Sequence, residues 1–412
     1  MSSARFSTFL TQIAEALREE KGPELAYLLK PTSEHGKILV KEFRNPTRQT
    51  LSYYEGSLEG PWDEVAIQYV LVVNHCAKKR AAEAFKEECS LVLLFLRYFA
   101  LNSGWTLPAL FSVLRDLRDL AFDADLEAAA SGQEGTAAME EAARIISKAF
   151  SSCVTDRQSP IAESRKWGVY YVVGLVLKCY FRVKRISLAK NILRAINANP
   201  DIPPLSSYPR SHQVTYRYYI GMLSFLNEDF AKAEQELTLA FYNCYTGAHS
   251  NQERILTYLI PLRIIRGHLP SRELLARFPV LDELYSPFIA AIRTGDIRTY
   301  DACLDRFERR LVDLNLWLTL DQARELCIRG LFRRVWIASA KATRIPLAMF
   351  HSALLIAGMD VSIDEAECLI ANMVYKDFLK GYIAHEKQFV VLSKANAFPR
   401  LADRPSPYAL FH

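Results

Sequence analysis

Basic side chains recur near the end of the sequence at spacings that could bind phosphate groups. Arg329 and Arg333 would lie one turn apart on a helix with Arg334 beside them, while apolar residues such as Leu326 follow the opposite stripe. The candidate nucleic-acid-binding residues are Arg329, Arg333, Arg334, Lys341, Arg344, Lys376, Lys380, Lys387 and Lys394. Such a set could follow an RNA backbone without reading its bases, or it could be the solvated charge of an ordinary surface.

Residues with the chemistry of catalysis do not form a recognisable motif. The eight His are isolated except for His75, which precedes Cys76 in a helical stretch with no further ligand at metal-binding spacing, so a buried or capping role is favoured over a ligand role. Phosphate-binding glycine loops, nucleophile elbows and His-Glu-x-x-His are absent from the sequence, as is the His-x-His of isopeptidase-type metal sites. We therefore expect no enzyme, no catalytic residue, no metal and no cofactor.

Composition excludes wholesale disorder and a dedicated nucleic-acid coat. Of the 412 residues, 50% are hydrophobic and 24% are charged, and the formal net charge is +5. The eight Cys are scattered without a Cys-x-x-Cys, which predicts reduced, mostly buried thiols in a cytosolic or nuclear protein. The longest apolar stretch, 167–183, is interrupted by Lys178 and Arg182, so no membrane insertion is expected.

The elements that position these residues are almost entirely helical up to about residue 320. Two helical hairpins are clearest: 167–182 returning over 187–196, and 214–226 returning over 230–244. Each return helix carries Ala with Leu four residues later, a small-residue ridge on which helices approach closely. The spacing does not match a strict 34-residue repeat, so we predict a degenerate, tetratricopeptide-like solenoid over residues 1–320.

A different pattern follows over residues 321–395. Three helices are predicted at 321–340, 347–357 and 363–375, the last opened by a capping box at Ser362 and Glu365. Short β-branched and aromatic strands follow at 379–385 and 388–392, and 343–346 could supply a first edge strand. This order predicts a C-terminal winged helix in a mostly α fold. The Pro-rich residues 396–412 are expected to form a short, frayed tail.

Acidic residues in the third of these helices argue against the reading of duplex sequence. Asp364, Glu365 and Glu367 fall in its first turns, where a major-groove recognition helix would meet phosphates. Favourable interaction with the helix dipole explains their presence. Any nucleic acid is therefore expected to be RNA that is bound through its backbone.

The last strand also suggests a protein interface. Phe389, Val390, Val391 and Leu392 form an apolar run that does not alternate as a half-exposed strand would. Burial on one side by the winged helix and on the other by a partner would account for this run. We therefore predict these four residues as a partner interface.

The order of the motifs resembles one family. The resemblance spans about residues 60–400 and rests on Lys166-Trp-Gly168, Thr215-Tyr-Arg-Tyr-Tyr-Ile-Gly221, Asp229-Phe230, Ala233-Glu234, Tyr258-Leu-Ile-Pro-Leu262, Gly267-His-Leu-Pro270, Leu369-Ile-Ala-Asn372 and Gly381-Tyr-Ile-Ala-His385. Helical repeats that run into a winged helix with these motifs are similar to the PCI module. Within it they resemble the subfamily that holds the Thp-type mRNA-export subunit, its animal PCI-domain counterpart and the signalosome-twelve subunit of fungi.

The resemblance implies a noncatalytic scaffold subunit and a set of partners. They are a larger PCI-like scaffold of GANP/Sac type, a small acidic Sem/DSS-type peptide, and RNA, in a nuclear-pore-linked platform that couples transcription to mRNA export. The alternative is a signalosome or proteasome-lid-type scaffold without RNA contact. The expected location is the nucleus, with the cytoplasm as a second possibility.

Overall fold

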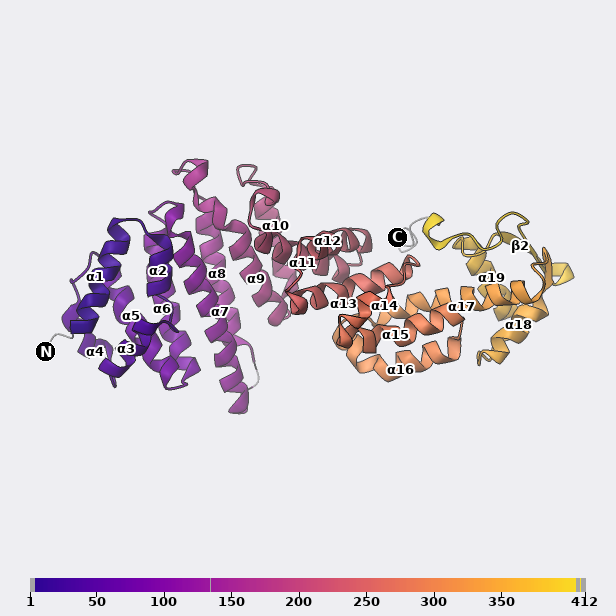
Figure 1. Ribbon diagram of the computed structural model, residues 1–412, viewed down its shortest axis with the longest axis horizontal. Coiled ribbons are helices and arrows are strands. Elements are labelled where there is room, and N and C mark those ends of the chain that lie inside the picture. The colour runs from indigo at the N-terminus through magenta and orange to yellow at the C-terminus, as the bar shows by residue number, and fades with distance from the viewer. Residues whose placement is uncertain (1–3, 134, 405–407, 409–412) are drawn as a thin grey trace. The chain divides into compact units, whose positions relative to one another are not determined.

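Helices make up most of the chain, as the periodicity predicts (Figure 1). The computed structural model describes residues 4–133, 135–404 and 408. Two compact units are present, Met1–Tyr216 and Arg217–His412, and the division falls within helix α11 (Arg210–Leu226). The predicted boundary near residue 320 separates helical hairpins from the winged helix, whereas the division within α11 separates two compact units. The boundary near residue 320 stays a prediction.

The first unit is a series of antiparallel helices. Figure 1 shows α6 to α9 side by side, and each contacts the next along the chain. Apolar faces at helical spacing drive this packing, as in α6, where Leu91, Phe95 and Phe99 are fully buried. The helices are α1 (Ala4–Arg18), α2 (Gly22–Leu28), α3 (Glu34–Glu42), α4 (Arg48–Leu51), α5 (Trp62–Ala77), α6 (Ala81–Phe99), α7 (Leu107–Ala130), α8 (Ala137–Val154), α9 (Val169–Arg182) and α10 (Ala189–Asn197).

The second unit continues the helical pattern and ends in a small sheet. Helix α12 packs on α13, while α15, α16 and α17 pack on one another. The elements after α11 are α12 (Phe230–Asn243), α13 (His249–Ile265), α14 (Arg272–Ala276), α15 (Pro279–Thr294), α16 (Ile297–Asp313), α17 (Trp317–Ala338), β1 (Arg344–Pro346), α18 (Leu347–Ile356), α19 (Ile363–Tyr375), β2 (Gly381–Ala384) and β3 (Phe389–Leu392).

Both predicted helical hairpins are confirmed to within a few residues. Helices α9 and α10 form the first, and α11 and α12 form the second. A small residue allows close approach in the second hairpin, because a Cβ added at Gly221 would lie 2.7 Å from Cγ of Leu237. Leu237 belongs to the predicted Ala-and-Leu ridge, and it is fully buried.

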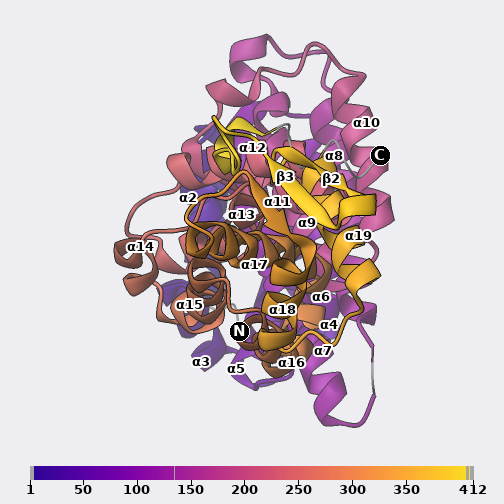
Figure 2. The ribbon, with the colours of Figure 1, turned by 90° about the vertical axis from the view of Figure 1, so that its right-hand side faces the viewer.

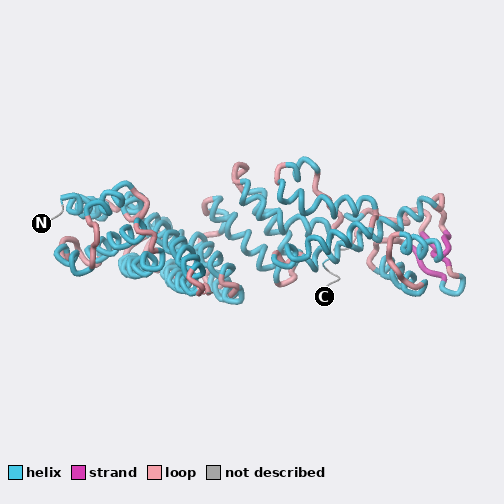
Figure 3. Tube along the Cα trace, turned by 90° about the horizontal axis from the view of Figure 1, so that it is seen from below, coloured by secondary structure: helices cyan, strands magenta, loops and turns pink. Residues whose placement is uncertain are grey.

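The winged helix is also confirmed, in the order α17, β1, α18, α19, β2, β3. In Figure 3 the strands are confined to the C-terminal part of the second unit, and Figure 2 shows β2 and β3 beside α19. All pairing is antiparallel in the order β1-β3-β2, so that β3 is the central strand. The predicted capping box is present, with Ser362 accepting from the Glu365 backbone and Glu365 accepting from the Ser362 backbone.

The prediction of a frayed tail is wrong for its described residues. Leu401 lies against Gly267, where a Cβ would come within 2.4 Å of the leucine Cβ, and this glycine has a φ of +84° that favours Gly. The Tyr408 hydroxyl donates to Glu234 and to the Leu262 carbonyl, both at 3.1 Å. Proline removes backbone donors but does not prevent packing, so side chains anchor this segment.

Each of the eight Cys is free, and five of them are buried, as predicted. Over the described residues, helices long and apolar enough to cross a membrane are not found.

Candidate functional site

Seven of the nine predicted nucleic-acid-binding residues have exposed side chains in the second unit. They are Arg333, Arg334, Lys341, Arg344, Lys380, Lys387 and Lys394. Within the described part of the chain, no ion pair within 4.0 Å engages any of these seven. Their charge is therefore available to solvent and to an anion.

Arg329 is not part of this exposed set. Its Nη2 donates to the Pro399 carbonyl at 2.7 Å, and its guanidinium lies 5.8 Å from the centre of the Phe398 ring. Burial, together with the positive charge of neighbouring Arg333, lowers the pKa of Arg329 to about 10. This arginine anchors the tail to α17, a role that helical spacing cannot reveal.

Lys376 is also engaged within the chain. It caps α19, and its Nζ forms an ion pair with Glu325 of α17 while its side chain is 31% exposed. Its backbone carbonyl accepts from Arg404 at 3.5 Å. Lys376 therefore ties together two helices and the tail, and it is less available to a phosphate than the exposed lysines.

The strand register brings four of the exposed cations to one end of the sheet. The Ser393 backbone donates to the Lys380 carbonyl at 2.9 Å, which places Lys380 and Lys394 at the end where β2 begins and β3 ends. Arg344 pairs with Val391, and the Leu392 backbone donates to the Thr343 carbonyl at 2.7 Å, so Arg344 and Lys341 lie toward the same end. We call Lys341, Arg344, Lys380 and Lys394 the open-end cations.

Lys387 lies elsewhere. It is in the turn that joins β2 to β3, at the opposite end of the hairpin from Lys380. Four strand residues separate the two ends, a length of about 13 Å at the usual rise per residue. A single phosphate therefore cannot contact both ends.

The acidic residues of α19 have structural roles. Glu365 completes the capping box, and both carboxylate oxygens of Glu367 lie within 3.0 Å of Nδ1 of His385 in the hairpin turn. The hydrogen bond and the charge of Glu367 raise the pKa of His385. The first turns of α19 thus carry negative charge next to the hairpin turn, which is consistent with the expectation that this winged helix does not bind duplex DNA by its sequence.

The predicted partner interface needs a correction. Val390 is 0% and Leu392 is 3% exposed, and both belong to the core of the winged helix itself. Their strand is central, with β1 on one side and β2 on the other. Val390 and Leu392 are therefore not available to a partner, and only Phe389, at 38% exposure, and the half-buried Val391 face outward.

The register defines an outward face that the sequence reading missed. Arg344, Val391 and Tyr382 pair across the three strands in one row, and Pro346, Phe389 and Ala384 pair in the next. Paired residues share a face, and Tyr382 is 62% exposed. We call these six residues the outer sheet face. Finding it requires knowing that β1 pairs with β3, which the sequence does not state.

The structure offers no metal centre among its described residues, because no three His, Cys, Asp or Glu side chains are placed to hold an ion. Burial raises the pKa of the Cys76 thiol to about 11. A thiol that stays protonated is a poor nucleophile, which argues against a catalytic use of the His75-Cys76 pair.

Comparison with known proteins places this architecture in a family. A model of the PCI domain matches residues 304–394. A "Protein CSN12 homolog" of Schizosaccharomyces pombe is 37% identical, covering 84% of this chain and 85% of that protein. The chain belongs to the PCI-domain family. A "Protein CSN12 homolog" of Mycosarcoma maydis is 42% identical over 78% of this chain and 76% of that protein. The "PCI domain-containing protein 2" of Xenopus laevis is 30% identical over 98% of this chain and 99% of that protein.

The predicted PCI family is thus confirmed, and the Thp-type export subunit is not singled out by these names. The matched PCI segment begins within α16 and ends at Lys394, so it contains all nine predicted cations and the outer sheet face. The exposed features of the winged helix therefore lie inside the PCI domain.

Proposed function

We propose that this PCI protein is a noncatalytic scaffold subunit of a signalosome-type assembly and that its winged helix meets another PCI protein. The observation that carries the proposal is the outer sheet face, where Tyr382 and Phe389 expose aromatic surface on a PCI domain. Aromatic residues are enriched at protein interfaces, where they bury large areas at small entropic cost. The relatives named "CSN12 homolog" support the choice of assembly.

The edges of the sheet favour one side for this contact. Strand β1 has three residues and ends in Pro346, which lacks a backbone donor. Strand β2 has four residues and none is proline, and Tyr382 projects from it beside the exposed Phe389 of β3. A partner strand that paired with β2 would cover the tyrosine as well.

Affinity purification of the full chain from its own cells, followed by mass spectrometry, tests the assembly. Recovery of signalosome subunits supports the proposal. Recovery of nuclear-pore and mRNA-export proteins without them contradicts it and favours the second candidate below.

The second candidate is the RNA platform of nuclear mRNA export, with a larger scaffold of GANP/Sac type and a small acidic Sem/DSS-type peptide as partners. The exposed set that includes the open-end cations, Arg333 and Arg334 favours it. Lys341 directly follows the C-terminal turn of α17, since its backbone donates to the Trp336 carbonyl at 2.9 Å. The arginines of α17 and the open-end cations could therefore follow one strand of RNA.

Catalysis can be tested directly. Purified chain should not cleave ubiquitin or a ubiquitin-like protein from a conjugate. Robust turnover that persists through repeated purification would contradict the scaffold proposal.

A further inference from the structure

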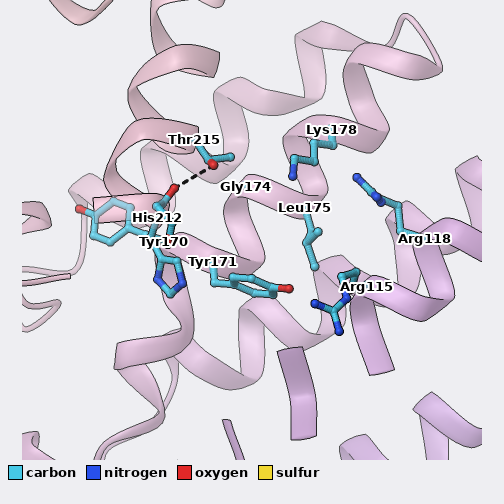
Figure 4. Close-up of a pocket in the computed structure, with 10 residues that line it drawn as sticks. Arg115, Arg118, Tyr170, Tyr171, Gly174, Leu175, Lys178, His212 and Thr215 are labelled. Carbon is cyan, nitrogen blue, oxygen red and sulfur yellow. Dashed lines mark hydrogen bonds between the residues drawn. The ribbon is translucent and has the colours of Figure 1, made fainter. Parts of the chain in front are cut away.

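A pocket of about 130 Å³ lies in the first unit, where α7, α9 and the first turns of α11 meet (Figure 4). Arg115 and Arg118 of α7 and Lys178 of α9 line it on one side. His212 and Thr215 of α11 line the other side, and Figure 4 shows the Tyr171 ring between the two. The lining therefore divides into a basic end and an uncharged polar end.

The basic end gathers positive charge without a carboxylate in the lining. Arg115 and Arg118 are three residues apart and so project from the same side of α7, and Lys178 comes from the facing helix. Like charges held together destabilise a fold unless an anion compensates them. Burial raises the pKa of the Tyr171 hydroxyl, Arg115 and Arg118 lower it, and Asp116 and Asp119 raise it, so both the basic residues and their acidic neighbours lie near this group.

Two acidic residues that follow the arginines in the sequence pair with them. Arg118 forms an ion pair with Asp119, whose side chain is 53% exposed, and Nε of Arg115 lies 4.0 Å from Asp116. Because Asp119 is largely exposed, its pair with Arg118 contributes little free energy, and a better-placed anion can replace it. Burial raises the pKa of Asp116 to about 6, so this carboxylate loses its charge, and with it the pairing with Arg115, only in mildly acidic solution.

The rest of the pocket is held in place by packing. The Tyr171 hydroxyl donates to the Phe111 carbonyl at 3.1 Å, and its ring centre lies 5.2 Å from that of His212. At Gly174 a Cβ would lie 3.0 Å from Cγ2 of Thr215, so the glycine lets α9 and α11 pack closely beside the pocket. The Thr215 hydroxyl donates to the Ser211 carbonyl at 2.9 Å.

We propose that this pocket binds a phosphate monoester. The phosphate lies between Arg115, Arg118 and Lys178, and the organic part of the ester, a short polar stem, points toward His212 and Thr215. Two arginines and a lysine suit a dianion, because guanidinium groups bind phosphate oxygens in pairs. Pockets for drug-sized ligands usually exceed about 300 Å³, so this one has room for a phosphate and a short stem but not for a nucleoside. The site lies outside the matched PCI segment and is independent of the proposed function.

Isothermal titration of the full chain tests this site, with inorganic phosphate and O-phosphoserine as probes. We expect saturable binding at one site. The double variant Arg118→Gln/Lys178→Gln should bind each probe at least about tenfold more weakly, since each lost charged hydrogen bond weakens binding by roughly 10- to 100-fold. The matched control Lys86→Gln/Lys190→Gln removes two exposed cations away from the pocket and should bind like the wild type.

The two probes distinguish the source of the phosphate. Tighter binding of O-phosphoserine than of inorganic phosphate would show that the pocket also contacts the organic part of the ester. Equal affinity for the two probes would assign the site to free phosphate. Circular dichroism of the double variant should match that of the wild type. Equal affinity of the wild type and the folded double variant would overturn the proposal, as would displacement of phosphate by a single-stranded RNA with a 5′-hydroxyl, which would assign the pocket to the RNA backbone.

Discussion

Glu367 of α19 and His385 of the hairpin turn form a direct link across the winged helix, with Nδ1 at 2.9 Å and 3.0 Å from the two carboxylate oxygens. The His385 side chain is 73% exposed, whereas that of Glu367 is 16% exposed. The link therefore joins the turn carrying Lys387 to the acidic start of α19. It is strongest when His385 is protonated.

The first prediction concerns the pH dependence of this link. Because the folded pKa of His385 is raised, its contribution to stability is present below the unfolded pKa of about 6.5 and is lost as the pH rises through the folded value. Glu367→Gln should return the His385 pKa toward its ordinary value, as followed by NMR titration of the imidazole. An unchanged pKa in the folded variant would show that Glu367 is not the cause.

The second prediction concerns the tail. Glu234 is buried and paired with Arg263 at 2.7 Å and Arg266 at 2.9 Å, and the Tyr408 hydroxyl joins this network. Tyr408→Phe should lower the free energy of unfolding by about 1–3 kcal/mol, since a hydrogen bond to a charged group is lost in a buried place. The measurement is the urea midpoint of the full chain.

A matched control separates this hydrogen bond from a general effect of the substitution. Tyr375 is 76% exposed, so Tyr375→Phe should leave the urea midpoint unchanged. Equal midpoints for Tyr408→Phe and Tyr375→Phe would mean that the hydrogen bond from Tyr408 to Glu234 does not stabilise the second unit.

Local sequence signals were sufficient to predict most elements of the winged helix. The capping box places the start of α19 at Ile363, and β-branched and aromatic residues mark the strands. These signals depend on neighbours within a few residues. The same holds for both helical hairpins, in which apolar spacing marks the helices and short polar turns join them.

What the sequence did not reveal depends on distant contacts. Tyr408 meets Glu234, and Arg329 meets Pro399, and no local pattern connects either pair. The outer sheet face depends on the pairing of Arg344 with Val391, and the basic pocket depends on Lys178 facing α7. Periodicity says which side of an element is apolar, but not which element covers it.

The third prediction separates the core of the sheet from its outer face. Tyr382→Asp with Phe389→Asp should leave the fold intact, because both side chains are exposed, and should abolish association with a PCI partner. Val390→Asp should instead destabilise the winged helix by several kcal/mol, since it buries a charge without a partner. Size exclusion of the complex and circular dichroism distinguish the two effects. A folded double variant that still assembles would exclude the outer sheet face as the interface.

The last prediction asks whether the exposed cations bind RNA. Arg333, Arg334, Lys380 and Lys394 are exposed, and the last two share one end of the sheet. Reversing all four to Glu should weaken binding of the assembled complex to single strands of any sequence, by at least about tenfold near 0.1 M salt.

The salt dependence identifies the cause of the weakening. The slope of log affinity against log salt should become shallower by about 0.7 for each phosphate contact that is lost, because each contact releases condensed counterions. The matched control reverses Lys86, Lys190, Arg272 and Arg309, which are also exposed but lie outside the winged helix. It removes the same net charge, so a nonspecific electrostatic effect would weaken both variants alike. Unchanged affinity and slope in the winged-helix variant, with assembly intact, would exclude these cations from RNA binding and leave the scaffold role alone.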